Sequence, residues 1–408
     1  MNYNLLFNRL AIALAFIIPI SIAGYNLILA ALTLTWILEA KWKEKWEMIK
    51  IQPVFKAMLI YFLFTVLSLL WTENLSSGLY YVKQYYIFFL LPILYTSIDR
   101  SHIPKFLSAF LLAMIISEII SYLIYFDVMP FKLNPSWSPS DPSPFMMHTI
   151  YSIFLVFSIF LMLTRLSYEK RTQSKAVIYI FFIISMTLNL FLNSGRTGQF
   201  SLLLAMMVFI YIRYNFHWIK TITIAIAVSG TVFITAFFIS HTFQQRSIET
   251  YNSLCYTLEN KQALNNDSTG LRFMMWQVAS NIILEHPIIG VGVGDERDSY
   301  AKTLSNKLPE LKLYINGFSD LHNTYLKILV STGVIGLSLF LWVFYTLYKE
   351  IETSTELHII GGVLISLLLQ YMFIGNLPAA YLTILFIFMI SIVLKHPHSK
   401  CFDTFSVK

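Results

Sequence analysis

The chain has 408 residues, of which 57% are hydrophobic and 12% are charged, and its mean hydropathy is +0.64. Soluble domains carry about 25% charged residues, so this composition excludes a soluble globular protein. The net charge of +7 would suggest a nucleic-acid partner in a soluble protein. In a membrane protein, basic loops on one side of the bilayer explain it, and no nucleic-acid partner is expected.

Apolar runs recur along the whole chain. A helix needs roughly 20 predominantly apolar residues to cross a bilayer, and only helices or closed barrels satisfy their backbone in lipid. The runs are continuous rather than alternating, which predicts an all-α polytopic membrane protein that forms one domain, residues 1–408. The predicted spans cover about residues 6–23, 25–40, 54–71, 81–98, 103–126, 148–165, 177–193, 198–214, 220–240, 323–348, 358–375 and 378–395.

Lysine and arginine in the short loops predict the orientation. One set of alternate loops holds most of them, from Lys41 near the first spans to Lys395 in the tail. The opposite set holds Lys132 and Arg196, with Lys83 just inside a span. The positive-inside rule therefore places both termini in the cytoplasm. The first apolar run has no clear cleavage site after it and is predicted to be an uncleaved span.

Two loops are expected on the outer face. Residues 127–147 are rich in proline and serine. Residues 241–321 form one long loop between spans nine and ten, and loops of that length are usually functional or disordered. A helix is predicted there from Gly270 to Glu285. Apolar residues such as Trp276 indicate that the loop folds onto the membrane domain. Cys255 in this loop and Cys401 in the tail fall on opposite faces, so no disulfide is implied.

The first candidate site is the turn Asn193-Ser194-Gly195-Arg196-Thr197-Gly198, between two outer span ends. Arg196 lies at the membrane boundary beside the start of a helix. Its guanidinium matches phosphate oxygens, and a helix N-terminus favours anions. The alternative is an arginine that snorkels at the end of a span.

The second candidate is Arg272, at the start of the predicted loop helix, with Ser268 or Thr269 as its cap. A cation in the first turn opposes the helix dipole, so it calls for a compensating anion. An exposed surface arginine is the alternative.

A glycine-rich run follows the same helix, His286-Pro287-Ile288-Ile289-Gly290-Val291-Gly292-Val293-Gly294. It predicts a close turn or a backbone approach to a ligand, but it does not follow a strand, which excludes a dinucleotide fingerprint. Asp295, Glu296 and Asp298 come next and are interpreted as a solvated turn. No metal site and no cofactor are predicted.

His322 stands at the outer N-terminal end of span ten, in Leu321-His322-Asn323-Thr324-Tyr325-Leu326. The field of a helix N-terminus disfavours the imidazolium, so a neutral imidazole can act there as a general base toward a sugar hydroxyl. A capping or interfacial histidine is the alternative.

Together these segments resemble the O-antigen ligase and polymerase superfamily, most closely its ligase branch. The resemblance rests on the turn around Arg196, on Arg272, on Glu285 to Gly292, and on His322-Asn323 with ten residues between His322 and Gly333. It is strongest over about residues 190–340. One departure is Trp276, where the ligase pattern has leucine four residues after the arginine.

The resemblance implies a GT-C-like, inverting and metal-independent glycosyltransferase in the bacterial inner membrane, with its active site facing the periplasm. The donor would be a glycan on undecaprenyl pyrophosphate, held by Arg196 and Arg272. His322 would deprotonate a hydroxyl of the lipid A–core acceptor. Substrate contacts are further expected from Lys83, Asn323, Tyr325 and Gly333.

Three other functions remain open. An O-antigen polymerase would use a lipid-linked glycan as the acceptor, and a protein O-oligosaccharyltransferase would use a protein. A transporter of polyprenyl-linked glycan or solute belongs to a different class and predicts charges along the spans and broken midplane helices. Intramembrane charges are few here, mainly Lys83, Glu118 and Lys327, which favours an interfacial enzyme.

Overall fold

The computed structural model describes residues 2–129, 137–168, 172–260, 268–311, 321–377 and 380–396. These residues form helices, short 3-10 turns and two isolated β-bridges, which confirms the all-α prediction. Each predicted span falls on a helix or on consecutive helices. Their bounds are α1 Tyr3–Ile17, α2 Ile22–Glu39, α4 Pro53–Leu67 with η1 Ser68–Trp71, α5 Leu75–Gln84 with η2 Tyr85–Phe89 and α6 Leu90–Ser97, α7 Ile103–Tyr125, α8 His148–Tyr168, α9 Gln173–Leu192, α10 Arg196–Tyr214, α11 Trp218–Ile239, α16 Thr324–Lys349, α17 Thr355–Tyr371 and α18 Ala380–Val393.

Eight of the described helical segments are long and apolar enough to cross a membrane, and α1, α17 and α18 are shorter apolar helices. The protein is therefore a multi-pass membrane protein. The fourth predicted span is not one helix, because η2 separates α5 from α6. The short helix α3, Trp42–Ile51, joins α2 to α4.

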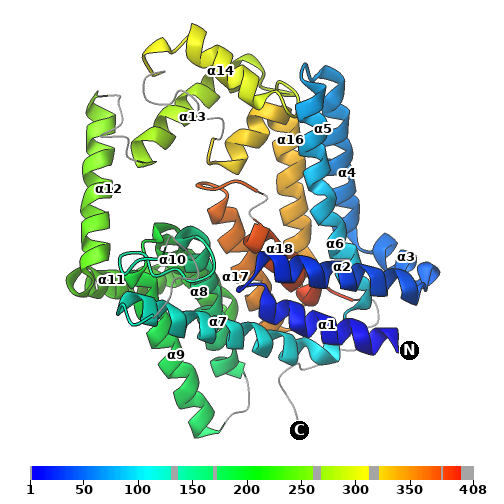
Figure 1. Cartoon of the computed structure of the whole chain (residues 1–408), viewed down its shortest axis with the longest axis vertical. Coiled ribbons are helices and arrows are strands. Elements are labelled where there is room, and N and C mark those ends of the chain that lie inside the picture. The colour runs from blue at the N-terminus through cyan, green and yellow to red at the C-terminus, as the bar shows by residue number, and fades with distance from the viewer. Residues whose placement is uncertain are drawn as a thin grey trace.

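The helices differ in how deeply they are buried. In α8, 83% of the apolar window is buried, against 17% in α11. Helix α8 packs against α9, α10 and α17 and so forms part of the core, whereas α11 stands at the edge (Figure 1). An apolar side chain that faces lipid is already in an apolar solvent, so the exposed isoleucines of α11 are expected.

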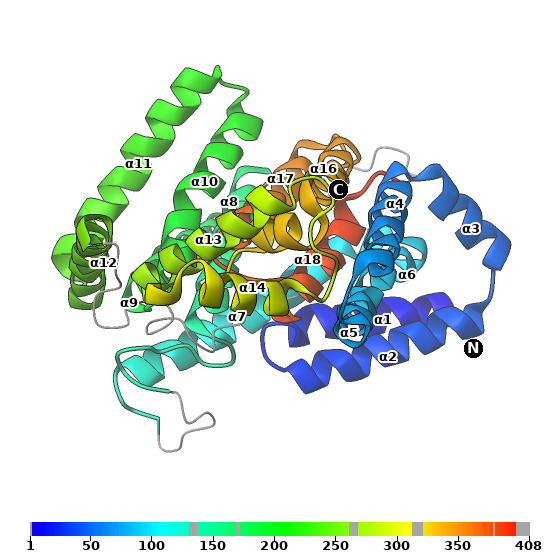
Figure 2. The same cartoon turned by 90° about the horizontal axis from the view of Figure 1, so that it is seen from above.

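The long loop between α11 and α16 contains α12 His241–Asn260, α13 Ser268–Glu285, α14 Glu296–Asn306 and η4 Pro309–Leu311. The predicted helix at Gly270–Glu285 is confirmed by α13. Helices α13 and α14 lie together above the start of α16 (Figures 1 and 2). They share a separate apolar cluster with that end of α16, in which Met275 of α13, Leu304 of α14 and Val330 of α16 are buried.

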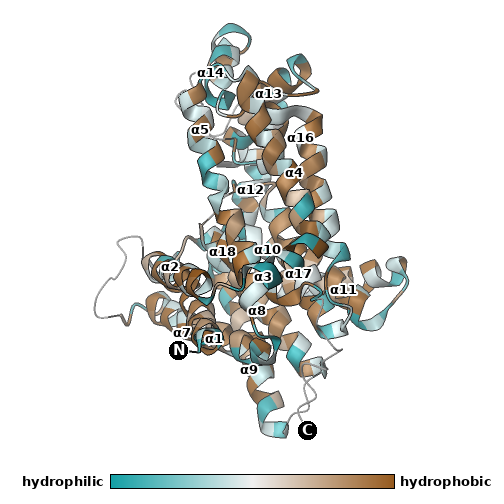
Figure 3. Ribbon diagram, turned by 90° about the vertical axis from the view of Figure 1, so that its right-hand side faces the viewer, coloured by the Kyte–Doolittle hydropathy of each residue, from teal (hydrophilic) through white to brown (hydrophobic). Residues whose placement is uncertain are grey.

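The hydropathy of the chain follows this arrangement. Figure 3 shows apolar residues along α4 and α16, while polar residues gather on α14. The loop therefore covers one end of the helical bundle (Figure 1). Arg272 lies within the loop, and Arg196 and His322 lie at helix starts that contact or follow it.

Candidate active site

The turn at Asn193–Gly198 is held by a buried asparagine. Asn193 caps the turn, since its Oδ1 accepts from the backbone N–H of Gly195 at 2.8 Å. Its Nδ2 donates to Ser143 Oγ at 2.7 Å. The Gly198 N–H donates to Ser152 Oγ on α8 at 3.1 Å. The turn is thus fastened to α8 and to the segment before it by side chains that are satisfied within the fold.

Glycine is required in this turn by close approach. A Cβ on Gly195 would lie 2.5 Å from the His148 carbonyl oxygen, and one on Gly198 would lie 2.4 Å from Ser152 Cβ. The two glycines therefore let the first turn of α10 rest directly on α8. Arg196, which directly follows the first of these glycines, points away from that contact, because its Nη1 donates to Thr250 Oγ1 on α12 at 2.5 Å.

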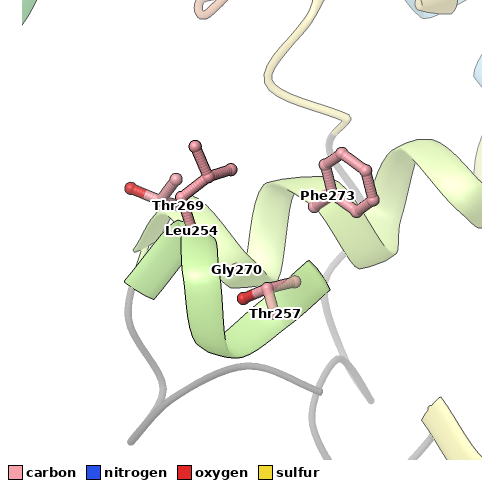
Figure 4. Close-up of a pocket in the computed structure, with 5 residues that line it drawn as sticks. All are labelled: Leu254, Thr257, Thr269, Gly270 and Phe273. Atoms are coloured by element: carbon pink, nitrogen blue, oxygen red, sulfur yellow. The ribbon is translucent and has the colours of Figure 1, made fainter. Parts of the chain in front are cut away.

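Helix α12 contacts both α10, which begins at Arg196, and α13, which carries Arg272. Four and seven residues after Thr250, which accepts from Arg196, come Leu254 and Thr257, on the same face of the helix. These two residues contact the first turns of α13, where they meet Thr269, Gly270 and Phe273 (Figure 4). The gap between them is only about 10 Å³, so it is a packing contact that admits at most one water.

Arg272 lies between Gly270 and Phe273 of that contact and is half-buried in the first turns of α13. One turn later, Trp276 donates its indole N–H to the Leu321 carbonyl oxygen at 3.1 Å. Residues four apart lie on one face of a helix, so Arg272 and the anchor of the His322 segment share a face of α13. The departure from the ligase pattern at Trp276 thus has a structural role.

His322 is placed by its neighbours on both sides. Its φ of 46° lies in the left-handed region, which is uncommon for a residue with a side chain and marks a constrained position. Asn323 caps α16, since its Oδ1 accepts from the Leu326 N–H at 3.0 Å. The Thr324 N–H donates to the Met372 carbonyl oxygen at 2.8 Å, just beyond the end of α17.

The end of α17 also holds the Arg196 turn. Gln370 donates from Nε2 to the Thr197 carbonyl oxygen at 3.3 Å and accepts from Ser201 Oγ on α10. Gln370 and Met372 thus fasten the residues next to Arg196 and His322 to the same end of one helix. The structure therefore links Arg196, Arg272 and His322 through α12, α13 and α17.

The other predicted contact residues have different surroundings. Tyr325 donates its hydroxyl to the Leu369 carbonyl oxygen at 2.7 Å and packs its ring on Phe373. Asn323 is buried and used as a cap. Lys83 is exposed on the last turn of α5.

The glycine-rich run contains the predicted close turns, and its backbone lies against that of α16. Helix α16 is kinked at Gly333, with φ 63° and ψ −164°, which leaves carbonyl groups without their helical partners. The Val291 and Gly292 N–H groups donate to the Val330 and Ser331 carbonyl oxygens at 2.9 Å each. The Val334 N–H donates to the Pro287 carbonyl oxygen at 2.9 Å.

Two glycines make this contact possible. A Cβ on Gly290 would lie 2.4 Å from the Ser331 carbonyl carbon, and one on Gly333 would lie 2.3 Å from the Ile288 carbonyl carbon. Both residues have positive φ, which favours glycine. Gly333 therefore contributes to the site by setting the path of the chain.

The interpretation of Asp295 and Glu296 as a solvated turn is wrong. Asp295 is 5% exposed, and its carboxylate accepts from the backbone N–H groups of Glu73 and Asn74 at 2.6 and 2.8 Å. Glu296 is 9% exposed, and its Oε2 accepts from the Gly294 N–H at 2.9 Å. Burial raises the pKa of Glu296 above its ordinary value, an effect that the nearby Lys327 partly opposes. Only Asp298 of the three is exposed.

Part of the chain matches a known protein family. Residues 180–341 match the O-antigen ligase family model. The predicted resemblance is confirmed over this part of the chain. The O-antigen ligase match includes Arg196, Arg272, His322 and Gly333, and it does not reach Lys83.

A similar protein also bears the name of a ligase. A protein of Rickettsia typhi named "Putative polysaccharide ligase" is 31% identical over 100 residues, which is 24% of this chain and 24% of that protein. The similarity thus spans about a quarter of either chain.

Sequence reasoning missed three residues that build the site. The sequence identifies Trp276 as an apolar loop residue and a departure from the ligase pattern but not as an anchor, Gln370 lies in an apolar span, and Glu296 is predicted to be solvated. A glutamine within an apolar helix was the available signal for Gln370, because a polar group there requires a partner.

Proposed function

We propose that the protein is an O-antigen ligase-type glycosyltransferase. It moves a glycan from undecaprenyl pyrophosphate to a hydroxyl of the lipid A–core oligosaccharide, at the periplasmic face of the bacterial inner membrane. One observation carries the proposal. Helix α12 contacts both Arg196 and the first turns of the helix of Arg272, and α13 in turn anchors the residue before His322.

The two arginines suit a diphosphate. Arg196 stands at the first position of α10, where the helix dipole favours an anion. Guanidinium groups form paired hydrogen bonds with phosphate oxygens. Cations fixed beside a low-dielectric boundary stabilise the charge that develops as the diphosphate leaves. The lipid tail of the donor requires entry from the bilayer, which a site at the membrane edge permits.

His322 is the proposed base. Its imidazole takes the proton from an acceptor hydroxyl, and the hydroxyl oxygen attacks the anomeric carbon from the side opposite the diphosphate. The new C–O bond forms as the bond to the diphosphate oxygen breaks, which inverts the configuration at that carbon and needs no metal in this scheme. The left-handed backbone and the capped start of α16 hold the ring in place for this step.

The test is a transfer assay with the purified protein in proteoliposomes. Lipid-linked glycan is supplied with lipid A–core in one arm and with a second lipid-linked glycan in the other. We expect transfer to lipid A–core by the wild type and none by His322→Ala, with both proteins equally folded. Elongation of the lipid-linked glycan alone would make the protein a polymerase. Equal transfer by His322→Ala would refute the proposed base.

A further inference from the structure

The segment before α8 ends in a histidine–aspartate pair that the proposed reaction does not use. His148 is the first residue of α8, and its Nδ1 lies 2.8 Å from Asp141 Oδ2. An ionised carboxylate only accepts hydrogen bonds, so the imidazole Nδ1–H is the donor. Both side chains are partly exposed, 36% for His148 and 31% for Asp141. The pair therefore forms the outer end of whatever it binds within the fold.

A chain of hydrogen bonds joins this pair to the Arg196 turn. Ser143 Oγ donates to Asp141 Oδ1 at 2.9 Å, and Asn193 Nδ2 donates to Ser143 Oγ at 2.7 Å. The Gly195 N–H, directly before Arg196, donates to Asn193 Oδ1 at 2.8 Å. Every donor in the chain thus points toward the Asp141 carboxylate.

The middle of this chain is buried. Asn193 is 0% exposed and Ser143 is 7% exposed, so water does not readily replace a partner there. Hydrogen bonds in series strengthen one another in a low-dielectric interior. If Ser143 shifts, the Asn193 amide loses its acceptor, and the side chain that holds the Gly195 N–H must move. A change at the outer pair therefore reaches the backbone of the turn.

His148 also contacts the turn through its own backbone. A Cβ on Gly195 would lie 2.5 Å from the His148 carbonyl oxygen, which shows how closely the two chains approach. Ser194 Oγ adds a second link, since it donates to the Ser140 carbonyl oxygen at 3.1 Å. The side chain and the backbone of His148 thus act on the same turn, the one that carries Arg196.

We propose that His148 is a positioning residue for the binding of the donor diphosphate. It acts through a hydrogen-bonded set, here called the His148 relay, which comprises His148, Asp141, Ser143 and Asn193. The relay holds the Gly195 backbone and so fixes the start of α10, where Arg196 is proposed to bind the diphosphate. The inference rests on the proposed function and deepens it. His148 has no contact with substrate in this scheme and transfers no proton.

The first readout is hydrogen exchange of the 193–199 peptide in nanodiscs. His148→Ala removes the Nδ1–H donor at a partly exposed position, so the protein should still fold. His148→Asn restores a donor, because the asparagine amide nitrogen takes the place of Nδ1. We expect exchange in this peptide to be about fivefold faster in His148→Ala and near the wild-type rate in His148→Asn. Equal exchange in His148→Ala and the wild type would refute the relay.

The second readout is the KM for the lipid-linked glycan in the transfer assay. We expect His148→Ala to raise the donor KM about fivefold and to leave the acceptor KM unchanged. Ser143→Ala, which breaks the relay at its centre, should act in the same direction, and His148→Asn should stay within about twofold of the wild type. A purely structural role would lower the amount of active protein and leave the donor KM unchanged. That result in His148→Ala and Ser143→Ala would overturn the inference.

The matched control is the histidine of another histidine–aspartate pair. His102 Nδ1 lies 3.5 Å from Asp99, just before α7, and the segment of Asp141 follows the other end of that helix. His102→Ala should leave both the exchange of the 193–199 peptide and the donor KM at wild-type values. Equal changes in His102→Ala and His148→Ala would show a general loss of stability and contradict the relay.

The two proposals fail in different ways. If the wild type neither binds undecaprenyl pyrophosphate nor transfers glycan, the proposed function fails, and the role of His148 in donor binding fails with it. If the wild type transfers glycan while His148→Ala keeps the wild-type donor KM, the inference fails alone.

Discussion

The two glycine-rich turns of the molecule, Asn193–Gly198 and His286–Gly294, make close backbone contacts with different helices. In the first, glycines bring the start of α10 against α8 and leave Arg196 turned toward α12. In the second, glycines pair the loop backbone with the kinked backbone of α16. In neither turn do the glycines themselves form an obvious ligand cradle. The comparison shows that close backbone contact positions a few other side chains, and those side chains carry the proposed chemistry.

The largest effect is expected where the second turn contacts α16 at Gly333. Gly333→Ala places a Cβ 2.3 Å from the Ile288 carbonyl carbon at a φ of 63°. Backbone strain and overpacking together cost about 3 kcal/mol or more, so we expect loss of folded protein and of transfer. Thermal melting in detergent measures the first. The control is Gly230→Ala in α11, where a Cβ meets no atom within 4 Å and the melting temperature should hold or rise.

At the first turn, the expected effect is on chemistry and not on folding. Arg196→Lys keeps the charge and loses the planar fork, so transfer should fall by about 10²-fold. The melting temperature should remain near that of the wild type. Arg213→Lys, at the opposite end of the same helix, is the matched control and should retain transfer within about twofold. Normal transfer by Arg196→Lys would show that a simple point charge suffices.

A smaller effect is expected where α13 connects the two regions. Trp276→Phe removes the indole N–H that donates to the Leu321 carbonyl oxygen. Loss of one such bond costs about 1 kcal/mol and loosens the residue before His322, so we expect about a tenfold fall in transfer. Trp218→Phe, at an exposed position of α11, is the control. If Trp276→Phe transfers glycan as fast as Trp218→Phe does, Trp276 makes no contribution to the site.

The smallest effect concerns pH and Glu296. Burial raises the pKa of this carboxyl in the folded protein, while the unfolded chain ionises near 4.5. The free energy of unfolding contributed by Glu296 is therefore greatest below pH 4.5 and falls as the pH rises toward the folded pKa. Glu296→Gln lacks this loss, so its melting temperature relative to the wild type should rise between pH 4.5 and pH 8. A constant difference over that range would contradict the buried, titrating carboxyl.

Hydropathy predicted where the apolar helices lie, since lipid imposes length and composition on each helix, and eight of the described helical segments are long enough to cross a membrane. It did not predict the break between α5 and α6, where η2 interrupts a run that remains apolar. The sequence motifs identified Arg196, Arg272 and His322 as separate candidate site residues. Their connection through Thr250, Gln370 and Trp276 was not predictable, because those hydrogen bonds join segments 45 to 173 residues apart.

The central claim is tested most directly by measuring donor binding and glycan transfer separately in the same variants. Binding of radiolabelled undecaprenyl pyrophosphate is measured for wild type, Arg196→Ala and His322→Ala in the same nanodiscs, alongside glycan transfer. We predict that His322→Ala binds the donor as the wild type does and transfers nothing, whereas Arg196→Ala loses binding. Full donor binding by Arg196→Ala, or normal transfer by His322→Ala, would contradict a diphosphate clamp beside a histidine base.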